Sequence, residues 1–404
     1  MLHGDCPVPS HAEPGFLAPG IDFDATALPL SDQLVVIAPD GTVAVLNASG
    51  RRLWEAFQAG CTVDDLVYAS VQEGRLLEDV ARSSILRALA SWRTLGLIDS
   101  AAQEEGPAPS AMPVVARPGG RAPKLDEVYL TGDCPVRVRC DDRVLAGVIE
   151  AACRSCRVER AEGALAIVDV IEQDGWFAVR ADDAVLARTD DLTQNRALAR
   201  HRCLTALLET TRPARRWLGI LHASAVSVDG RCVVLCGAKG SGKSTLAAAL
   251  VAAGAGFVTD DYAPLEQASW CVWPVPYAPG LKRGSWRALR QLYPDLYARP
   301  VHELAGLQIR YLELDGARMA PLDCGLPVKA LVFPRYEAGA VLRQQLITPA
   351  EALAGLCHAR SLLDRQTHVF AETLRWVESV PAYQLIYGDL DRAVESVLSL
   401  QGAE

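Results

Sequence analysis

The first clear pattern of hydrophobic and polar positions lies between residues 33 and 46. The stretch QLVVIAPDGTVAVL, which begins at Gln33, contains two runs of β-branched and other apolar residues on either side of the turn-forming sequence Pro-Asp-Gly. Two β-rich runs joined by a tight turn of this kind predict a β-hairpin.

Three helical patterns follow this hairpin. The first surrounds Trp54, and the second begins after Thr62, because Thr62 followed by Asp65 is a variant of the capping box. The third places apolar residues at i, i+4, i+7, i+8 and i+11 and is expected to end near Gly96. Its apolar residues are Ala81, Ile85, Ala88, Leu89 and Trp92. A small sheet with three helices predicts a compact winged-helix-like domain over residues 20–100.

The pattern changes after residue 100. Residues 101–124 are rich in Pro, Ala and Gly and show no periodicity, which predicts an extended linker. Residues 125–219 alternate short strand-like runs with two helical stretches, which predicts a small α+β lobe without identifiable chemistry. Strand-like and helical patterns continue through residues 220–404, so we expect an α/β domain that reaches the C-terminus.

A glycine-rich loop lies between a strand-like run and a helical pattern at residues 237–244. Its sequence, GAKGSGKS, fits the P-loop pattern G-x-x-x-x-G-K-[S/T], in which backbone N–H groups surround phosphate oxygens. Lys243 then reaches the β- and γ-phosphates, and the Ser244 hydroxyl ligates Mg²⁺. We therefore expect ATP and Mg²⁺ to bind here; a glycine-rich structural turn is the alternative. The expected contacts are Gly237, Lys239, Gly240, Ser241, Gly242, Lys243, Ser244 and Thr245.

Two adjacent carboxylates follow the next strand-like run. Asp260 and Asp261 end the stretch AGAGFVTDD, and Asp260 lies sixteen residues after Ser244. We expect this strand end beside the glycine-rich loop. A pair of carboxylates allows one to serve a metal ion while the other accepts a proton from an attacking hydroxyl. A solvated acidic pair at a strand end is the alternative interpretation.

Charge and hydropathy argue against two classes of partner. The chain has 40 basic and 49 acidic residues, a net charge of −9, and residues 21–100 have six basic against eleven acidic residues, a net charge of −5. Because phosphate contacts supply most of the affinity for nucleic acid, we do not expect the N-terminal domain to bind DNA. No window approaches twenty apolar residues without charge, so we expect no membrane span.

The twelve cysteines are scattered along the chain, and no signal peptide precedes them. Reduced thiols in a cytoplasmic protein are therefore expected. The spacing of Cys134, Cys140, Cys153 and Cys156 fits a zinc site poorly, and the apolar pattern around the last two predicts an ordinary helix.

Residues 21–100 resemble the PqqD-like family, the domains that recognise leader peptides of ribosomally made, post-translationally modified peptides. The resemblance rests on VVIAPDGTVAVLNASGRRLWEAFQAGCTVDDLV and on the ending GLID. It implies that a leader peptide adds as a strand to the edge of the sheet and settles against the third helix, between Ser83 and Trp92. The implied contacts are Thr42, Val43, Ala44, Val45, Leu46, Ile85, Leu89 and Trp92. The alternative interpretation is that these residues form the core of a small domain.

The second half of the chain resembles the catalytic domain of HPr kinase/phosphorylase and of related peptide serine kinases. The resemblance rests on LHASAVSVDGRCVVLCGAKGSGKSTLAAALVAAGAGFVTDD, in which His222 matches the family's histidine. It implies that Asp260 is the general base and that Asp261 is the carboxylate on the Mg²⁺ side. Thr245 stands where the bacterial regulatory enzyme has a glutamate, which argues against HPr as the substrate.

The two resemblances together predict an ATP-dependent kinase. We expect it to phosphorylate a Ser or Thr of a precursor peptide held through its leader, because linked domains raise the effective concentration of substrate. Lys282 and Arg310 are the favoured cations to neutralise the transferring phosphoryl group. One alternative is a nucleotide-responsive escort for the precursor; a DNA-binding ATPase is disfavoured by the acidic N-terminal domain. Other peptide-modifying enzymes and a second copy of the chain are further candidate partners.

Overall fold

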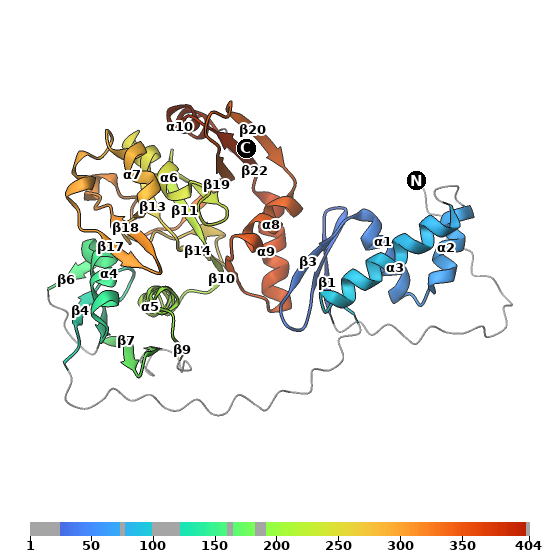
Figure 1. The fold of residues 1–404 in the computed structure, drawn as a ribbon, viewed down its shortest axis with the longest axis horizontal. Helices are drawn as coiled ribbons and strands as arrows, with labels where there is room; N and C mark the ends of the chain where they lie inside the picture. Colours follow the sequence, from blue (N-terminus) through green and yellow to red (C-terminus); the bar gives the residue numbers. More distant parts are fainter. Residues whose placement is uncertain (1–24, 73–76, 99–121, 160–164, 182–190, 401–404) are drawn as a thin grey trace. The chain divides into compact units, whose positions relative to one another are not determined.

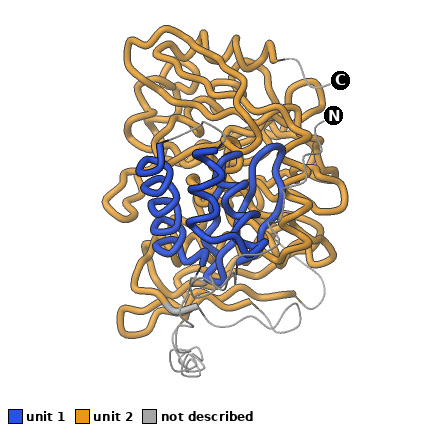
Figure 2. The backbone as a smooth tube through the Cα atoms, turned by 90° about the vertical axis from the view of Figure 1, so that its right-hand side faces the viewer, with its two compact units in different colours: residues 1–107 blue, residues 108–404 orange. Residues whose placement is uncertain are grey.

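A computed structural model describes residues 25–72, 77–98, 122–159, 165–181 and 191–400. The chain divides into two compact units, unit 1 (residues 1–107) and unit 2 (residues 108–404), each with a core of its own (Figure 2). The fold is mixed α/β, and the described strands form four sheets (Figure 1). Most of the predicted linker at residues 101–124 lies outside the described residues.

Unit 1 contains the predicted hairpin and one further strand. Strands β1 (Thr26–Leu30), β2 (Gln33–Ile37) and β3 (Val43–Leu46) form an antiparallel sheet in the order β1-β2-β3. Thr42, which we expected in the edge strand, lies in the turn, where its N–H donates to Asp40 Oδ1 at 2.7 Å. The edge strand therefore begins one residue later than expected.

The three predicted helices of unit 1 are present. They are α1 (Ala48–Gln58), α2 (Val63–Gln72) and α3 (Glu78–Thr94). Thr62 and Asp65 cap α2 reciprocally, since each side chain accepts a hydrogen bond from the other residue's N–H. Gly96 follows α3 with a φ of +66°, and its N–H donates to the Arg93 carbonyl, which ends the helix as expected.

The core of unit 1 corrects the expected peptide groove. Ile85, Leu89 and Trp92 are each at most 4% exposed and pack with Trp54 and Phe57. The rings of Trp54 and Trp92 meet edge to face, with centroids 5.2 Å apart. These three α3 side chains thus lie on the face that holds α3 to α1 and the sheet, which was the alternative interpretation.

Two helices pack on the first sheet of unit 2. The sheet consists, in order, of β6 (Arg157–Val158), β4 (Leu125–Tyr129), β5 (Val136–Cys140), β7 (Ala166–Gln173), β8 (Trp176–Ala181) and β9 (Asp191–Thr193). The helices are α4 (Arg143–Cys153) and α5 (Arg196–Thr211). Cys153 ends α4, and the thiol of Cys156 donates to the Pro276 carbonyl at 3.1 Å. The described residues contain no group of three or more His, Cys, Asp or Glu side chains that could hold a metal ion.

A ten-stranded sheet forms the largest part of unit 2. Its main path runs β13 (Gly256–Thr259), β11 (Ala223–Val228), β12 (Arg231–Cys236), β19 (Leu326–Tyr336), β15 (Cys271–Val272), β14 (Ala263–Glu266), β10 (Trp217–Leu221), β21 (Leu362–Leu363). Strand β22 (Ala382–Tyr387) pairs with β19 and with β20 (Arg343–Ile347). A separate small sheet has the order β16 (Gly280–Lys282), β18 (Leu307–Tyr311), β17 (His302–Leu304). Strands β12, β19 and β22 are parallel to one another, so their carboxyl ends lie at one edge of the sheet.

Helices cover both faces of this sheet (Figure 1). Helices α6 (Lys243–Ala252), α7 (Arg283–Leu289) and α10 (Leu390–Leu398) share a core cluster with Val332 of β19. Adjacent residues of a strand face opposite sides, so Phe333 points the other way. There it meets α8 (Pro349–His358) at Gly355, where a larger residue would overlap its ring, and α8 packs on α9 (Thr367–Ser379).

The predicted lobe at residues 125–219 is not a compact unit of its own. One core cluster joins Leu204 and Leu207 of α5 with Tyr262, Tyr277 and Tyr311, which lie beyond residue 219. Helix α5 is thereby fixed against the part of the chain that follows β13. No helix of the described residues is long and apolar enough to cross a membrane.

The core position of Ile85 predicts how two neighbouring substitutions differ. Ile85→Ala should destabilise unit 1 by about 2–5 kcal/mol, because it leaves a cavity in the core. Leu86→Ala, at a position that is 50% exposed, should change stability by less than about 0.5 kcal/mol. Hydrogen exchange of peptides from α1 and α3, followed at increasing urea concentration, measures the stability of unit 1 in both variants. Equal stability of the two variants would show that Ile85 is not a core residue.

Candidate functional site

The glycine-rich loop joins the end of β12 to the start of α6. Gly237, Gly240 and Gly242 have φ values of +138°, +91° and +102°, which side chains rarely allow. A Cβ atom on Gly242 would also lie 2.6 Å from the hydroxyl of Tyr387. Glycine is therefore required at 242 both by its backbone conformation and by this close approach.

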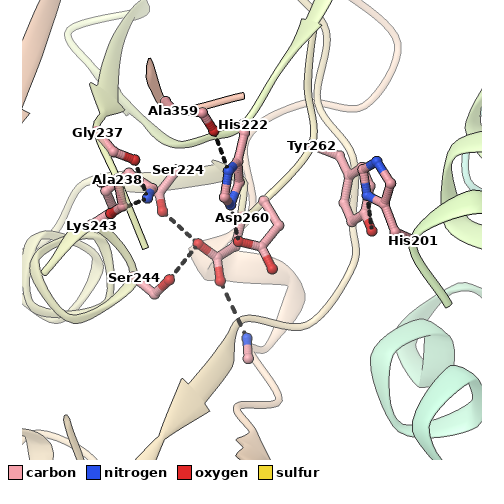
Figure 3. A network of polar contacts seen from close by, with 12 residues as sticks. His201, His222, Ser224, Gly237, Ala238, Lys243, Ser244, Asp260, Tyr262 and Ala359 are labelled. Atoms are coloured by element: carbon pink, nitrogen blue, oxygen red, sulfur yellow. Dashed lines mark hydrogen bonds and ion pairs between the residues drawn. The ribbon is translucent and has the colours of Figure 1, made fainter. Parts of the chain in front are cut away.

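The loop residues provide the donors that an anion needs. Helix α6 begins at Lys243, so its first N–H groups and the positive end of its dipole lie at the loop. The Ser241 hydroxyl oxygen is buried and has no hydrogen-bond partner among the described residues. The Lys243 ammonium donates to the carbonyls of Gly237 and Ala238 at 2.6 and 3.2 Å (Figure 3). Burial lowers the pKa of the Lys243 ammonium, although the negative charges of Asp261 and Asp260 act to raise it.

A cavity of about 570 Å³ lies against this loop. The predicted residues that line it are His222, Lys239, Gly240, Gly242, Lys243, Ser244, Thr245, Asp261 and Lys282. Its volume falls within the range of about 300–1,000 Å³ that is common for small-molecule sites. Most of the residues singled out in the sequence are therefore brought to one place.

Asp260 is buried directly beside the loop. It follows β13 and is 3% exposed. Its Oδ1 accepts hydrogen bonds from Ser244 Oγ at 2.9 Å and from Ser224 Oγ at 2.5 Å, and its Oδ2 accepts from the N–H of Gly280 at 3.2 Å (Figure 3). Burial and the neighbouring Asp261 charge raise the pKa of this carboxyl to about 6. A serine hydroxyl beside a carboxylate is the all-oxygen ligand type that Mg²⁺ prefers.

Asp261 has different surroundings. Its φ of +68° directs the side chain toward His222 Nε2, 3.4 Å from Oδ1, and Arg200 Nη2, 3.8 Å from Oδ2. His222 Nδ1 lies 2.7 Å from the carbonyl oxygen of Ala359 and must carry a proton to bond to it. Burial alone would raise the pKa of Asp261, but the His222 hydrogen bond and the Arg200 charge hold it below its usual range.

These contacts favour the opposite division of roles from the one that the family resemblance implies. Asp260 touches the Ser244 hydroxyl and has both oxygens engaged, which suits a metal-side carboxylate. The Asp261 side chain is 32% exposed and lines the cavity, which suits a group that meets a substrate. Geometry takes precedence over pKa in choosing a base, because a base must reach the proton that it accepts.

Arg310 is not part of this site. Its guanidinium on β18 donates to the carbonyls of Leu296 and Arg299, at 3.0 and 2.8 Å, and to that of Tyr297. It also stacks on Trp286 at 4.5 Å from the ring centroid. The three carbonyls share one nitrogen of Arg310, Nη1, and the side chain does not line the cavity, so the structure does not support the expectation that Arg310 neutralises phosphate charge.

Several residues of the site were missed in the sequence. Ser224 is fully buried in β11, an apolar strand whose two serines are not distinguished by the sequence. Arg200 belongs to α5, and only the packing of that helix against Tyr262 and Tyr311 brings it near Asp261. Ser285 was also missed; it lines the cavity, and its hydroxyl lies 2.7 Å from that of Thr245. Other missed residues that line the same cavity include Tyr336, Tyr387, Gly388 and Leu390.

Comparisons with known proteins found similar chains among solved structures. No family model and no curated protein matches the chain. Among solved structures, TbiB1 in complex with the TbiA(beta) leader peptide is similar at 18% identity, covering 21% of this chain and 96% of that chain, with a TM-score of 0.18. A match at this TM-score does not establish a shared fold.

The different positions of Arg310 and Lys282 predict different effects of their loss. Arg310→Ala should lower the melting temperature by roughly 3–6 °C without changing ATP affinity, because it removes charged hydrogen bonds of a side chain that does not line the cavity. Lys282→Ala should weaken ATP binding several-fold. Arg287→Ala, an exposed arginine of α7, is the control and should change neither. Thermal unfolding and calorimetric titration check this, and a loss of ATP affinity in Arg310→Ala would return that residue to the site.

Proposed function

We propose that this protein transfers the γ-phosphoryl group of ATP to a Ser or Thr hydroxyl of a peptide, and that unit 1 captures the peptide through its leader. The observation that supports the transfer is the convergence of three features on one cavity: the glycine-rich loop, the Ser244–Asp260 hydrogen bond and the Asp261–His222 pair. In this reaction the acceptor oxygen bonds to phosphorus, the bond from phosphorus to ADP breaks, and the hydroxyl proton leaves to a base.

The loop and its neighbours would hold the nucleotide. The N–H groups at the start of α6 face the phosphates, and Lys243 turns from the loop carbonyls to the β- and γ-phosphates. Ser244 and Asp260 would hold Mg²⁺, which neutralises charge on the phosphates when bound. Lys282 lines the same cavity and adds positive charge on the side of Asp261.

Asp261 would accept the hydroxyl proton. Its low pKa keeps it ionised at neutral pH, and His222 and Arg200 fix its orientation. A strong base is not needed, because the transition state of phosphoryl transfer is loose and positioning supplies most of the catalysis. Its partly exposed side chain can be reached by a hydroxyl that enters the cavity.

Strand β3 is an edge of the unit 1 sheet without a further partner strand among the described residues, which supports peptide capture. Ala38 N–H donates to the Thr42 carbonyl, and bonded pairs alternate along an antiparallel ladder. Ala44 is therefore bonded to β2, whereas the backbone groups of Val43 and Val45 point away from it. An extended leader could pair with these groups as an added strand.

Substitutions of the two aspartates should have different effects on phosphoryl transfer and on the Mg²⁺ requirement. Asp261→Asn should lower phosphoryl transfer by about 10²-fold or more while Mg·ATP binding stays within a few-fold. Asp260→Asn should instead raise the Mg²⁺ concentration needed for ATP binding by about tenfold or more. Asp229→Asn, an exposed acid in the β11–β12 turn, is the control and should do neither. Unchanged turnover in Asp261→Asn, or an unchanged Mg²⁺ requirement in Asp260→Asn, would contradict this assignment.

Removing one backbone N–H of β3 tests whether the leader pairs with this strand. Val45→Pro removes the outward N–H without breaking a bond to β2, so it should weaken leader-peptide binding and raise KM for the precursor. Val45→Ala keeps that N–H and should bind the leader within a few-fold of wild type. A peptide without leader should react equally with all three proteins. If Val45→Pro binds the leader as tightly as wild type, the leader does not pair with β3.

A further inference from the structure

One wall of the 570 Å³ cavity has no part in the proposed transfer. It is formed by Tyr336, Tyr387, Gly388 and Leu390. Tyr336 ends β19 and Tyr387 ends β22, and the two residues are partners in the parallel register of these strands. Both therefore stand at the carboxyl edge of the sheet, where β12 leads into the glycine-rich loop and where α/β proteins bind their ligands.

The backbone beneath Tyr336 is held on two sides. Its N–H donates to the carbonyl of Ser241 in the loop at 3.3 Å, and the N–H of Glu337 donates to the Tyr387 carbonyl at 2.9 Å. A Cβ atom on Gly388 would lie 2.6 Å from the nitrogen of Ala340, so only glycine allows these segments to meet. The position of Tyr336 is thus fixed relative to the loop.

The two tyrosine rings differ in exposure. Tyr387 is 2% exposed and packs against Gly242, whereas Tyr336 is 55% exposed. The ring centroids lie 5.7 Å apart with an interplanar angle of 65°. The buried ring packs against the exposed one, which presents an apolar aromatic surface on a rigid wall of the cavity.

The cavity lining combines two kinds of group. His222, Asp261 and Lys282 suit polar or charged groups of a ligand. Tyr336 and Leu390 suit a flat apolar group. A nucleotide combines both in one molecule, because a charged phosphate chain is attached to an uncharged aromatic base.

We propose that Tyr336 is the stacking platform for the base of the bound nucleotide, supported from behind by Tyr387. This inference rests on the proposed function, because it takes the glycine-rich loop as the phosphate site. Stacking on the ring face does not distinguish one base from another by its hydrogen-bonding groups, since every base has a π-face. The subsite would make the protein prefer a nucleoside triphosphate to the same phosphate chain without a nucleoside.

Two probes measure the base contact separately from the phosphate contact. Calorimetric titration of the full-length protein with ATP and with inorganic tripolyphosphate, both with Mg²⁺, gives a dissociation constant for each. Tyr336→Ala should weaken ATP binding about tenfold and leave tripolyphosphate binding unchanged, which also shows that the variant is folded. Tyr336→Phe keeps the ring and should bind ATP like wild type. Trp176→Ala, an exposed aromatic of another sheet, is the matched control and should have no effect.

The other outcomes each overturn the inference. Unchanged ATP affinity in Tyr336→Ala, with ATP binding still lost in Lys243→Ala, would reject the base platform and leave the nucleotide site intact. An equal loss of ATP and tripolyphosphate affinity would mean that Tyr336 supports the loop instead of a base. If the wild-type protein bound neither probe, the proposed function itself would fail, and this inference with it.

Discussion

The carboxylate of Asp260 is the point at which three segments of unit 2 meet. It accepts hydrogen bonds from Ser244 at the start of α6, from Ser224 in β11 and from the backbone of Gly280 before α7. Removing a carboxylate from water costs several kcal/mol unless such donors replace the lost hydration. The position of the glycine-rich loop relative to the sheet therefore depends on this one buried group, as does the position of Lys282 two residues after Gly280.

A single backbone conformation gives the next carboxylate a different environment. Asp261 has a left-handed φ, which aspartate tolerates better than most residues. Its side chain turns from the loop to His222 and Arg200, so two adjacent acids are held in separate sets of contacts. In the proposed function this separation assigns one acid to the metal ion and the other to the acceptor hydroxyl. Helix α5 contributes Arg200 to the surroundings of Asp261 because its apolar side packs against the rest of unit 2.

The sequence predicted the features that depend on local spacing and missed those that depend on packing. The loop, its strand and helix, the reciprocal cap of Thr62 and the stop at Gly96 follow from rules that act over a few residues. Which aspartate contacts Ser244 depends on the φ of Asp261, which no spacing reveals. Arg310 resembled a phosphate-binding arginine because a sequence does not show that its Nη1 donates to backbone carbonyls. Ile85 and Trp92 were assigned to a groove because core and groove residues of an amphipathic helix have the same pattern.

Mass spectrometry can detect the transfer of phosphate to a peptide. The full-length protein is incubated with ATP, Mg²⁺ and a leader-bearing precursor peptide that it binds, beside the Lys243→Ala variant. We expect a covalently added phosphate on a Ser or Thr of the peptide with the wild-type protein and none with the variant. A precursor that binds tightly at saturating Mg·ATP and yet gains no phosphate would contradict the account, and would identify the protein as an escort that binds peptide and nucleotide without chemistry.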